Sequence, residues 1–253
     1  MSNSKEQRYR ELIASVKEKY ASDGDLPHKL YWFDDCDEIN LWTYWQGRNH
    51  LDAEILLVGQ DWGNPWDSSC AGFREKLSHV GSGPIENYME NNDSITDNNL
   101  KALFQECLNI DISKPCPNVF FTNYILGYRE GKISGGYRAA WAKHDREFFR
   151  QLVEIMEPKV ILCLGRNVFE AVLMSWGQKP MPRIKRYNDY LDHQDKPQII
   201  KLQNQTEVSV FALAHCGAMG TMNRNRGYAD AQTDKLTLQK KDWGMIQNIR
   251  IRG

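Results

Sequence analysis

The stretch that decides the fold reads Lys159-Val-Ile-Leu-Cys-Leu-Gly165-Arg-Asn-Val-Phe-Glu-Ala-Val-Leu-Met-Ser-Trp176. Its first part is a continuous apolar run that Gly165 ends, which is typical of a strand buried on both faces of a sheet. The apolar spacing that follows predicts a helix over Arg166–Trp176. A buried strand followed at once by a helix is the repeating unit of a parallel α/β sheet.

Two more apolar runs continue this rhythm, and a hairpin completes it. Glu54–Val58 is a β-type run that stops at Gly59, and Asn118–Thr122 is another, followed by a predicted helix over Tyr137–Met156. Gln198–Leu202 and Glu207–Leu213 are expected to pair across a polar turn. The fold class predicted is α/β: a single domain with a central, mostly parallel four-stranded sheet flanked by helices.

The flanking segments are less regular. Lys5–Tyr20 has apolar residues at helical spacing, whereas the Trp- and Asp-rich stretch that follows has no clear period. Asp61–Asn98 is polar and long, which indicates a functional loop or short helices. We therefore expect one domain over residues 1–253, with an N-terminal helical and Trp-rich extension over 1–50 and a C-terminal helix over 229–249, which Gly244 interrupts.

Composition excludes several classes of protein. Lys and Arg total 32 and Asp and Glu total 33, so the net charge of −1 excludes a globally basic nucleic-acid coat. Any DNA contact must then come from local basic patches. The six cysteines form no C-x-x-C pair, and neither a secretory signal nor a membrane-length apolar run occurs. We expect a cytoplasmic protein with reduced thiols, no metal and no membrane partner.

Polar residues follow each predicted strand. Because ligands bind beyond the carboxyl ends of parallel strands, these residues should share one edge of the sheet. They are found in Gly59–Asp67, Asn123–Arg129, Gly165–Asn167 and His215–Arg224. An acid, an amide and an imidazole are therefore expected to converge there.

Four of these segments carry a resemblance. Val58-Gly-Gln-Asp61, Phe120-Phe-Thr-Asn123, Val160–Leu164 with Gly165, and Phe211-Ala-Leu-Ala-His215 resemble, in order, the core motifs of the uracil-DNA glycosylase superfamily. The resemblance covers roughly Glu54 to Arg224. It implies a uracil-DNA glycosylase-like fold and a monofunctional DNA glycosylase, which cleaves the N-glycosidic bond of a flipped uracil or C5-modified pyrimidine and leaves an abasic site.

The resemblance also implies catalytic roles. Asp61 would stabilise the oxocarbenium-like sugar or orient the attacking water, and His215 would donate a hydrogen bond to the carbonyl oxygen of the departing base. The structural alternatives are a turn-forming Asp that caps backbone amides and a satisfied His with no role in the reaction.

Substrate contacts are implied for five residues. Asn123 would read the pyrimidine edge with its amide, which both donates and accepts. Phe73 would stack on the flipped base, although Trp62, Trp66 or Tyr124 could do so instead, and any of these rings could simply be core. The remaining two substrate-binding candidates of the first motif are Gln60 and Gly63.

DNA is the expected partner, and the chain is expected to act as a monomer. Met219 or Met222, in the predicted loop after His215, would fill the space that the flipped base leaves. Arg224 and Arg226 would meet phosphates, although exposed arginines are most often only solvated.

The sequence departs from the family in three places. Gly63 stands where the strictest uracil enzymes have a Tyr that crowds the pyrimidine C5 position, so the pocket could admit larger bases. His215-Cys216-Gly217 replaces the usual His-Pro-Ser, and the cysteine ligands of the iron–sulfur branches are not matched, so no cofactor is expected.

These departures leave two alternatives open. The first is a glycosylase for hypermodified bases in bacteriophage DNA, such as glucosylated hydroxymethyl bases, that acts in antiviral defence. The second is a non-catalytic nucleic-acid-binding member of the fold. A generic nucleotide-binding enzyme fits poorly, because neither glycine-rich phosphate motif occurs.

Overall fold

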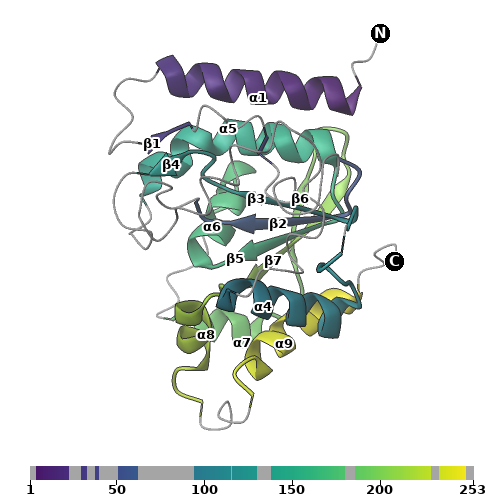
Figure 1. The fold of residues 1–253 in the computed structure, drawn as a ribbon, viewed down its shortest axis with the longest axis vertical. Helices are drawn as coiled ribbons and strands as arrows, with labels where there is room; N and C mark the ends of the chain where they lie inside the picture. Colours follow the sequence, from purple (N-terminus) through teal and green to yellow (C-terminus); the bar gives the residue numbers. More distant parts are fainter. Residues whose placement is uncertain are drawn as a thin grey trace.

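The protein is a single α/β domain built around one sheet (Figure 1). The computed structural model describes residues 4–22, 30–32, 38–39, 51–61, 94–114, 116–129, 138–179, 186–228 and 234–248. Within them, five strands form the sheet in the order β3-β2-β5-β7-β6. Their bounds are Ile55–Gly59 (β2), Val119–Asn123 (β3), Val160–Leu164 (β5), Gln198–Lys201 (β6) and Glu207–Leu213 (β7).

The sheet is mostly parallel, as predicted, but it has five strands and not four. β3, β2, β5 and β7 run parallel, and β6 pairs antiparallel with β7 at the edge. The predicted hairpin supplies the fifth strand, since Leu202 N donates to Thr206 O at 2.9 Å to close the turn. The prediction of four strands was therefore one too few, because it did not count the antiparallel edge strand β6.

The four parallel strands feed two cores, because successive side chains point to opposite faces. Leu56, Val58 and the alternate residues of the other strands pack on α1 (Lys5–Ser22), α5 (Ala139–Met156) and α6 (Arg166–Ser175). Ile55, Leu57 and their counterparts pack on the opposite helical layer. All five residues of β2, β3 and β5 are buried, which explains their continuous apolar sequences.

The opposite layer holds elements that sequence patterns located poorly. It comprises α4 (Ile95–Leu103), the π-helix η3 (Phe104–Leu108), α8 (Ala218–Asn225), α9 (Thr237–Gly244) and the 3₁₀ helix η5 (Met245–Asn248). α7 (Tyr187–His193) lies beside α8, held by a hydrogen bond from Asn188 Nδ2 to Asn223 O. A two-residue pair, β1 (Leu30–Tyr31) with β4 (Tyr128–Arg129), stands apart from the main sheet.

Several predicted boundaries agree with the structure and others shift. α1 and α5 match their predictions within two residues, and α5 ends at Glu157, whose φ of 54° stops the helix before Pro158. The predicted C-terminal helix is shorter where it is described, since α9 begins at Thr237, and 229–233 lie outside the described residues. Within the described ranges, no helix is both long and apolar enough to cross a membrane.

Candidate active site

Parallel pairing brings the predicted polar residues to one edge of the sheet. Gly59 pairs with Asn123 across β2 and β3, and Leu164 pairs with Leu213 across β5 and β7. The four parallel strands therefore end level with one another (Figure 1). Gln60, Asp61 and His215 follow directly from these strand ends, where open sheets bind ligands.

Asn123 lies over Gly59, which explains the glycine of the first motif. A Cβ at Gly59 would stand 2.3 Å from Asn123 Oδ1, so only a residue without a side chain fits beneath this amide. Asn123 is 5% exposed, and the chain after it stays paired to the end of β2. Tyr124 N donates to Gly59 O at 2.9 Å, and Ile125 N donates to Gln60 O at 3.0 Å. The backbone that carries the Asn123 amide is thereby held at the edge of the sheet.

A chain of side-chain amides orients the Asp61 carboxylate. Gln60 Nε2 donates to Asp61 Oδ2 at 2.8 Å, and Asn167 Nδ2, from the first turn of α6, donates to Gln60 Oε1 at 3.2 Å. Gln60 was predicted to bind substrate, whereas the hydrogen bonds of its amide in the structure are those that position Asp61. Asn167 enters the site because Gly165 ends β5 and starts α6 at the same edge.

The neutral imidazole of His215 is held in one tautomer. Gly217 N donates to His215 Nδ1 at 2.9 Å, so Nδ1 is an acceptor and the ring proton of the neutral form is on Nε2. Desolvation of the imidazole lowers the pKa of His215, and this outweighs the nearby Asp61 carboxylate, which acts in the opposite direction. The site thus contains a neutral imidazole with an N–H donor, within electrostatic range of a carboxylate.

Three helices clamp the turn that carries His215. Gln239 Nε2 of α9 donates to His215 O at 3.2 Å, and Asn99 Nδ2 of α4 donates to Cys216 O at 2.7 Å. Thr221 Oγ1 of α8 donates to Gln239 Oε1 at 2.9 Å. A Cβ at Gly220 would stand 2.1 Å from His215 O, so this glycine lets α8 pack against the turn. No local sequence pattern predicts that Asn99 or Gln239 contacts the His215 turn.

The predicted DNA-contacting residues divide between two faces of α8. The structure has a helix where a loop was expected, and Met219 and Met222 are 64% and 51% exposed on it. Arg226, just beyond its end, is also exposed. Arg224 is instead 1% exposed, because residues two apart on a helix point in opposite directions.

The guanidinium of Arg224 forms ion pairs inside the protein. Its Nε and Nη2 donate to both carboxylate oxygens of Asp242 at 2.8 Å, and Nη2 also donates to Asp192 Oδ1 at 2.8 Å. The expectation that Arg224 meets a phosphate is therefore corrected: it joins α8 to α7 and α9.

Other candidates fall outside the site or outside the described residues. Trp62, Gly63, Trp66 and Phe73 lie in the range 62–93, which the structure does not describe. Tyr124, the remaining stacking candidate, is 1% exposed and its hydroxyl lies 2.8 Å from Ser175 Oγ, so it is a core residue.

The Cys216 thiol at this edge is not activated as a nucleophile. Cys216 is fully buried beside His215, and its burial raises the pKa of the thiol, which disfavours a nucleophilic thiolate. In the part of the chain that the structure describes, no three His, Cys, Asp or Glu side chains gather as a metal site would require. The groups that the site offers are a carboxylate, an amide and a neutral imidazole.

Comparison with protein-family models and with curated proteins found no match for this chain.

Proposed function

We propose that this protein is a monofunctional DNA glycosylase with a uracil-DNA glycosylase-like fold, acting on a flipped uracil or C5-modified pyrimidine. One observation carries the proposal: Asp61, Asn123 and His215 come from three separate strand ends and meet at one edge of the sheet. The order of the four motifs along the four parallel strands supports the assignment of the fold.

The three groups suit the charges that develop when an N-glycosidic bond breaks. The bonding electron pair leaves with the base, so the sugar becomes cationic and the base anionic. The Asp61 carboxylate stabilises the cation or orients the water that adds to the sugar carbon, and the proton that this water loses neutralises the departed base. The His215 Nε2–H stabilises the anion through a hydrogen bond to the base oxygen, without giving up its proton.

Recognition of the base falls to Asn123. Its amide presents a donor and an acceptor in one plane, which matches the edge of a pyrimidine. The backbone that carries this amide is held in place, because the residues after Asn123 are bonded to β2, and Gly59 leaves the space that the amide occupies. A held backbone reduces the conformational freedom that is lost when a base binds.

Access to the base requires that it leave the DNA stack, at a cost of a few kcal/mol. The exposed Met219 and Met222 on α8 are suited to fill the vacated space, and Arg226 is placed to meet a phosphate. These side chains start from the helix that follows His215, so DNA contact and the reacting groups share one part of the fold.

An abasic-site assay on parallel substrates tests the proposal. Uracil, a thymine mismatch, and 5-hydroxymethylcytosine with and without glucose are each presented in single- and double-stranded DNA, followed by alkali cleavage. Product from uracil or from one of the C5-modified bases supports the proposal. Product from the glucosylated base alone favours the defence alternative, and no product from any substrate favours the non-catalytic binder.

A further inference from the structure

A groove of about 620 Å³ lies between α4 and α8, next to the His215 turn. Its apolar lining includes Ile95 and Met222, which are 60% and 51% exposed. Asn99 and Thr221 also line it. Asn99 bonds directly to the His215 turn at Cys216 O, and Thr221 bonds to Gln239, which supports the same turn. The groove therefore adjoins the proposed site through shared residues.

One lining residue of the groove, Asn225, is bonded to the chain beyond α8. Asn225 Nδ2 donates to Lys235 O at 2.8 Å, and because a backbone carbonyl only accepts, the amide oxygen must face the other way. That oxygen, Asn225 Oδ1, is buried beneath the wall of the groove, and among the described residues it has no hydrogen-bond partner. Asn225 therefore shapes the groove by joining the end of α8 to Lys235, and its oxygen is not open to a ligand.

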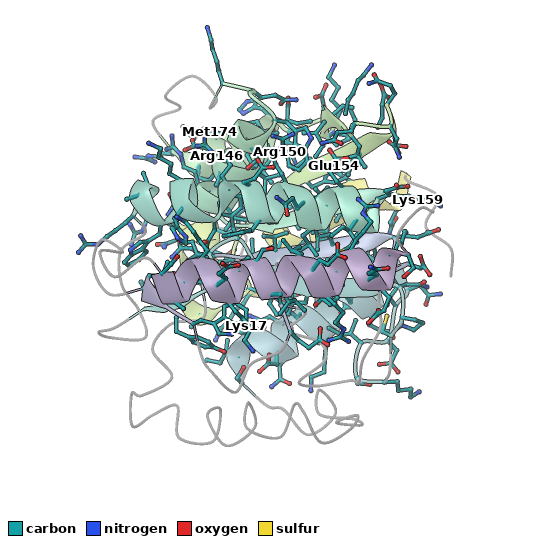
Figure 2. All side chains as sticks on the ribbon, turned by 90° about the horizontal axis from the view of Figure 1, so that it is seen from above. Lys17, Arg146, Arg150, Glu154, Lys159 and Met174 are labelled. Atoms are coloured by element: carbon teal, nitrogen blue, oxygen red, sulfur yellow. The ribbon has the colours of Figure 1, made fainter. Side chains whose placement is uncertain are left out.

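The charges around the groove have one sign. Arg226 and Lys235 line it and are exposed, and its described lining contains no acidic residue. A second groove, between α1 and α5, differs: its lining mixes both signs, with Arg8, Glu11, Glu147, Arg150 and Glu154. Figure 2 looks onto these two helices and shows Arg150 and Glu154 close together along α5. Of these two grooves, the one beside His215 has a described lining whose charge is complementary to an anion.

We propose that this groove binds one unpaired nucleotide of the DNA strand, adjacent to the nucleotide whose base reaches Asp61 and His215. The base lies on Ile95 and Met222, and the phosphate meets Arg226 and Lys235. This assignment rests on the proposed function only in taking DNA as the substrate. It implies that the protein binds single-stranded DNA more tightly than a fully paired duplex.

Fluorescence anisotropy with a short, unmodified, labelled single strand tests the groove without requiring catalysis. Each phosphate contact adds about 0.7 to the slope of log K against log salt for single strands. Because Arg226 and Lys235 share one phosphate, Arg226→Ala/Lys235→Ala should lower the magnitude of that slope by about 0.7 between about 50 and 200 mM salt. Lys179→Ala/Lys201→Ala, which removes two exposed lysines elsewhere on the surface, should leave the slope unchanged.

Two substitutions at Met222 test the apolar surface. Met222→Glu should weaken single-strand binding about tenfold, because it places an anion where the base packs. Met222→Leu should bind as the wild type does, since it keeps an apolar side chain. Met222 is half exposed, so both variants should fold, which circular dichroism and thermal melting check.

The outcomes separate this inference from the proposed function. Loss of binding in the groove variants supports the groove, even if no substrate yields abasic product. Wild-type binding and salt slope in Arg226→Ala/Lys235→Ala and in Met222→Glu would overturn it, even if uracil is excised. Wild-type protein that binds a duplex as tightly as a single strand, or that binds neither, would also overturn it.

Discussion

Replacing Gly59 by Ala should impair base recognition more than it impairs folding. The new Cβ would stand 2.3 Å from Asn123 Oδ1, whereas ordinary contact begins at 3.4 Å, so the amide oxygen must move by about 1 Å. The other nearby atoms, Asn123 Cγ at 3.5 Å and Phe121 Cε2 at 3.6 Å, already lie at contact distance. The strain therefore falls on the end of one side chain and not on the backbone.

The two consequences differ in size. Overpacking of this kind costs about 1–3 kcal/mol of unfolding free energy, and the lower end applies because the Asn123 amide can rotate away. A displacement of about 1 Å in a positioning group can lower the rate about 10²-fold. We therefore expect a folded variant whose kcat/KM for the preferred base falls about 10²-fold.

Urea unfolding and abasic-site kinetics, measured on the same preparations, separate these effects. Gly244→Ala is the matched control: a Cβ there meets nothing within 4 Å at the end of α9, so stability and activity should be retained. A Gly59→Ala protein with wild-type kcat/KM would refute the placement of Asn123 as the base-reading group.

Three further predictions concern the His215 turn and its supports. Gly220→Ala would place a Cβ 2.1 Å from a backbone oxygen, His215 O, so it should destabilise the protein by about 1–3 kcal/mol in urea unfolding, and an unchanged midpoint would contradict the packing described. The lowered pKa of His215 means that the folded state binds fewer protons than the unfolded chain just below the ordinary value of about 6.5. Its contribution to stability is thus fully present above about pH 6.5 and declines as the pH falls below it. The value of kcat/KM should also fall below about pH 6.5, as the fraction of His215 that is neutral decreases. An acid limb of the pH–rate profile centred above about pH 6.5 would disagree with this. Arg224→Met should cost about 3–5 kcal/mol, because Asp242 is left buried without its cation. Arg224→Met/Asp242→Leu should recover part of that loss, and no recovery in denaturant unfolding would argue against the pair.

The sheet was predictable because its strands are buried on both faces. Val160–Leu164 is observed as the strand that its apolar run predicts, and the parallel register then brings Asp61, Asn123 and His215 together. The strand ends could therefore be predicted from the sequence. The distances between the side chains at these ends depend on strand pairing, which cannot be predicted from any one segment.

The helices around His215 were less predictable for physical reasons. α8 contains Gly220 and two asparagines, which are poor helix formers, and its tertiary contacts through Arg224 and Gly220 account for its order. The start of α4 does carry a local signal, since Ser94 Oγ accepts from Asp97 N at 3.2 Å as an N-cap. Gln239 lies 24 residues from the carbonyl that it supports, so only the folded chain reveals its role.

The central claim is that Asp61 acts on the reacting sugar. Single-turnover formation of abasic sites tests it most directly, with wild type, Asp61→Asn and, as the matched control, Asp189→Asn, an exposed position on α7. With the best substrate from the panel, Asp61→Asn should react about 10²–10⁴-fold more slowly, while Asp189→Asn keeps the wild-type rate. An Asp61→Asn protein that excises the base as fast as the wild type would contradict the assignment.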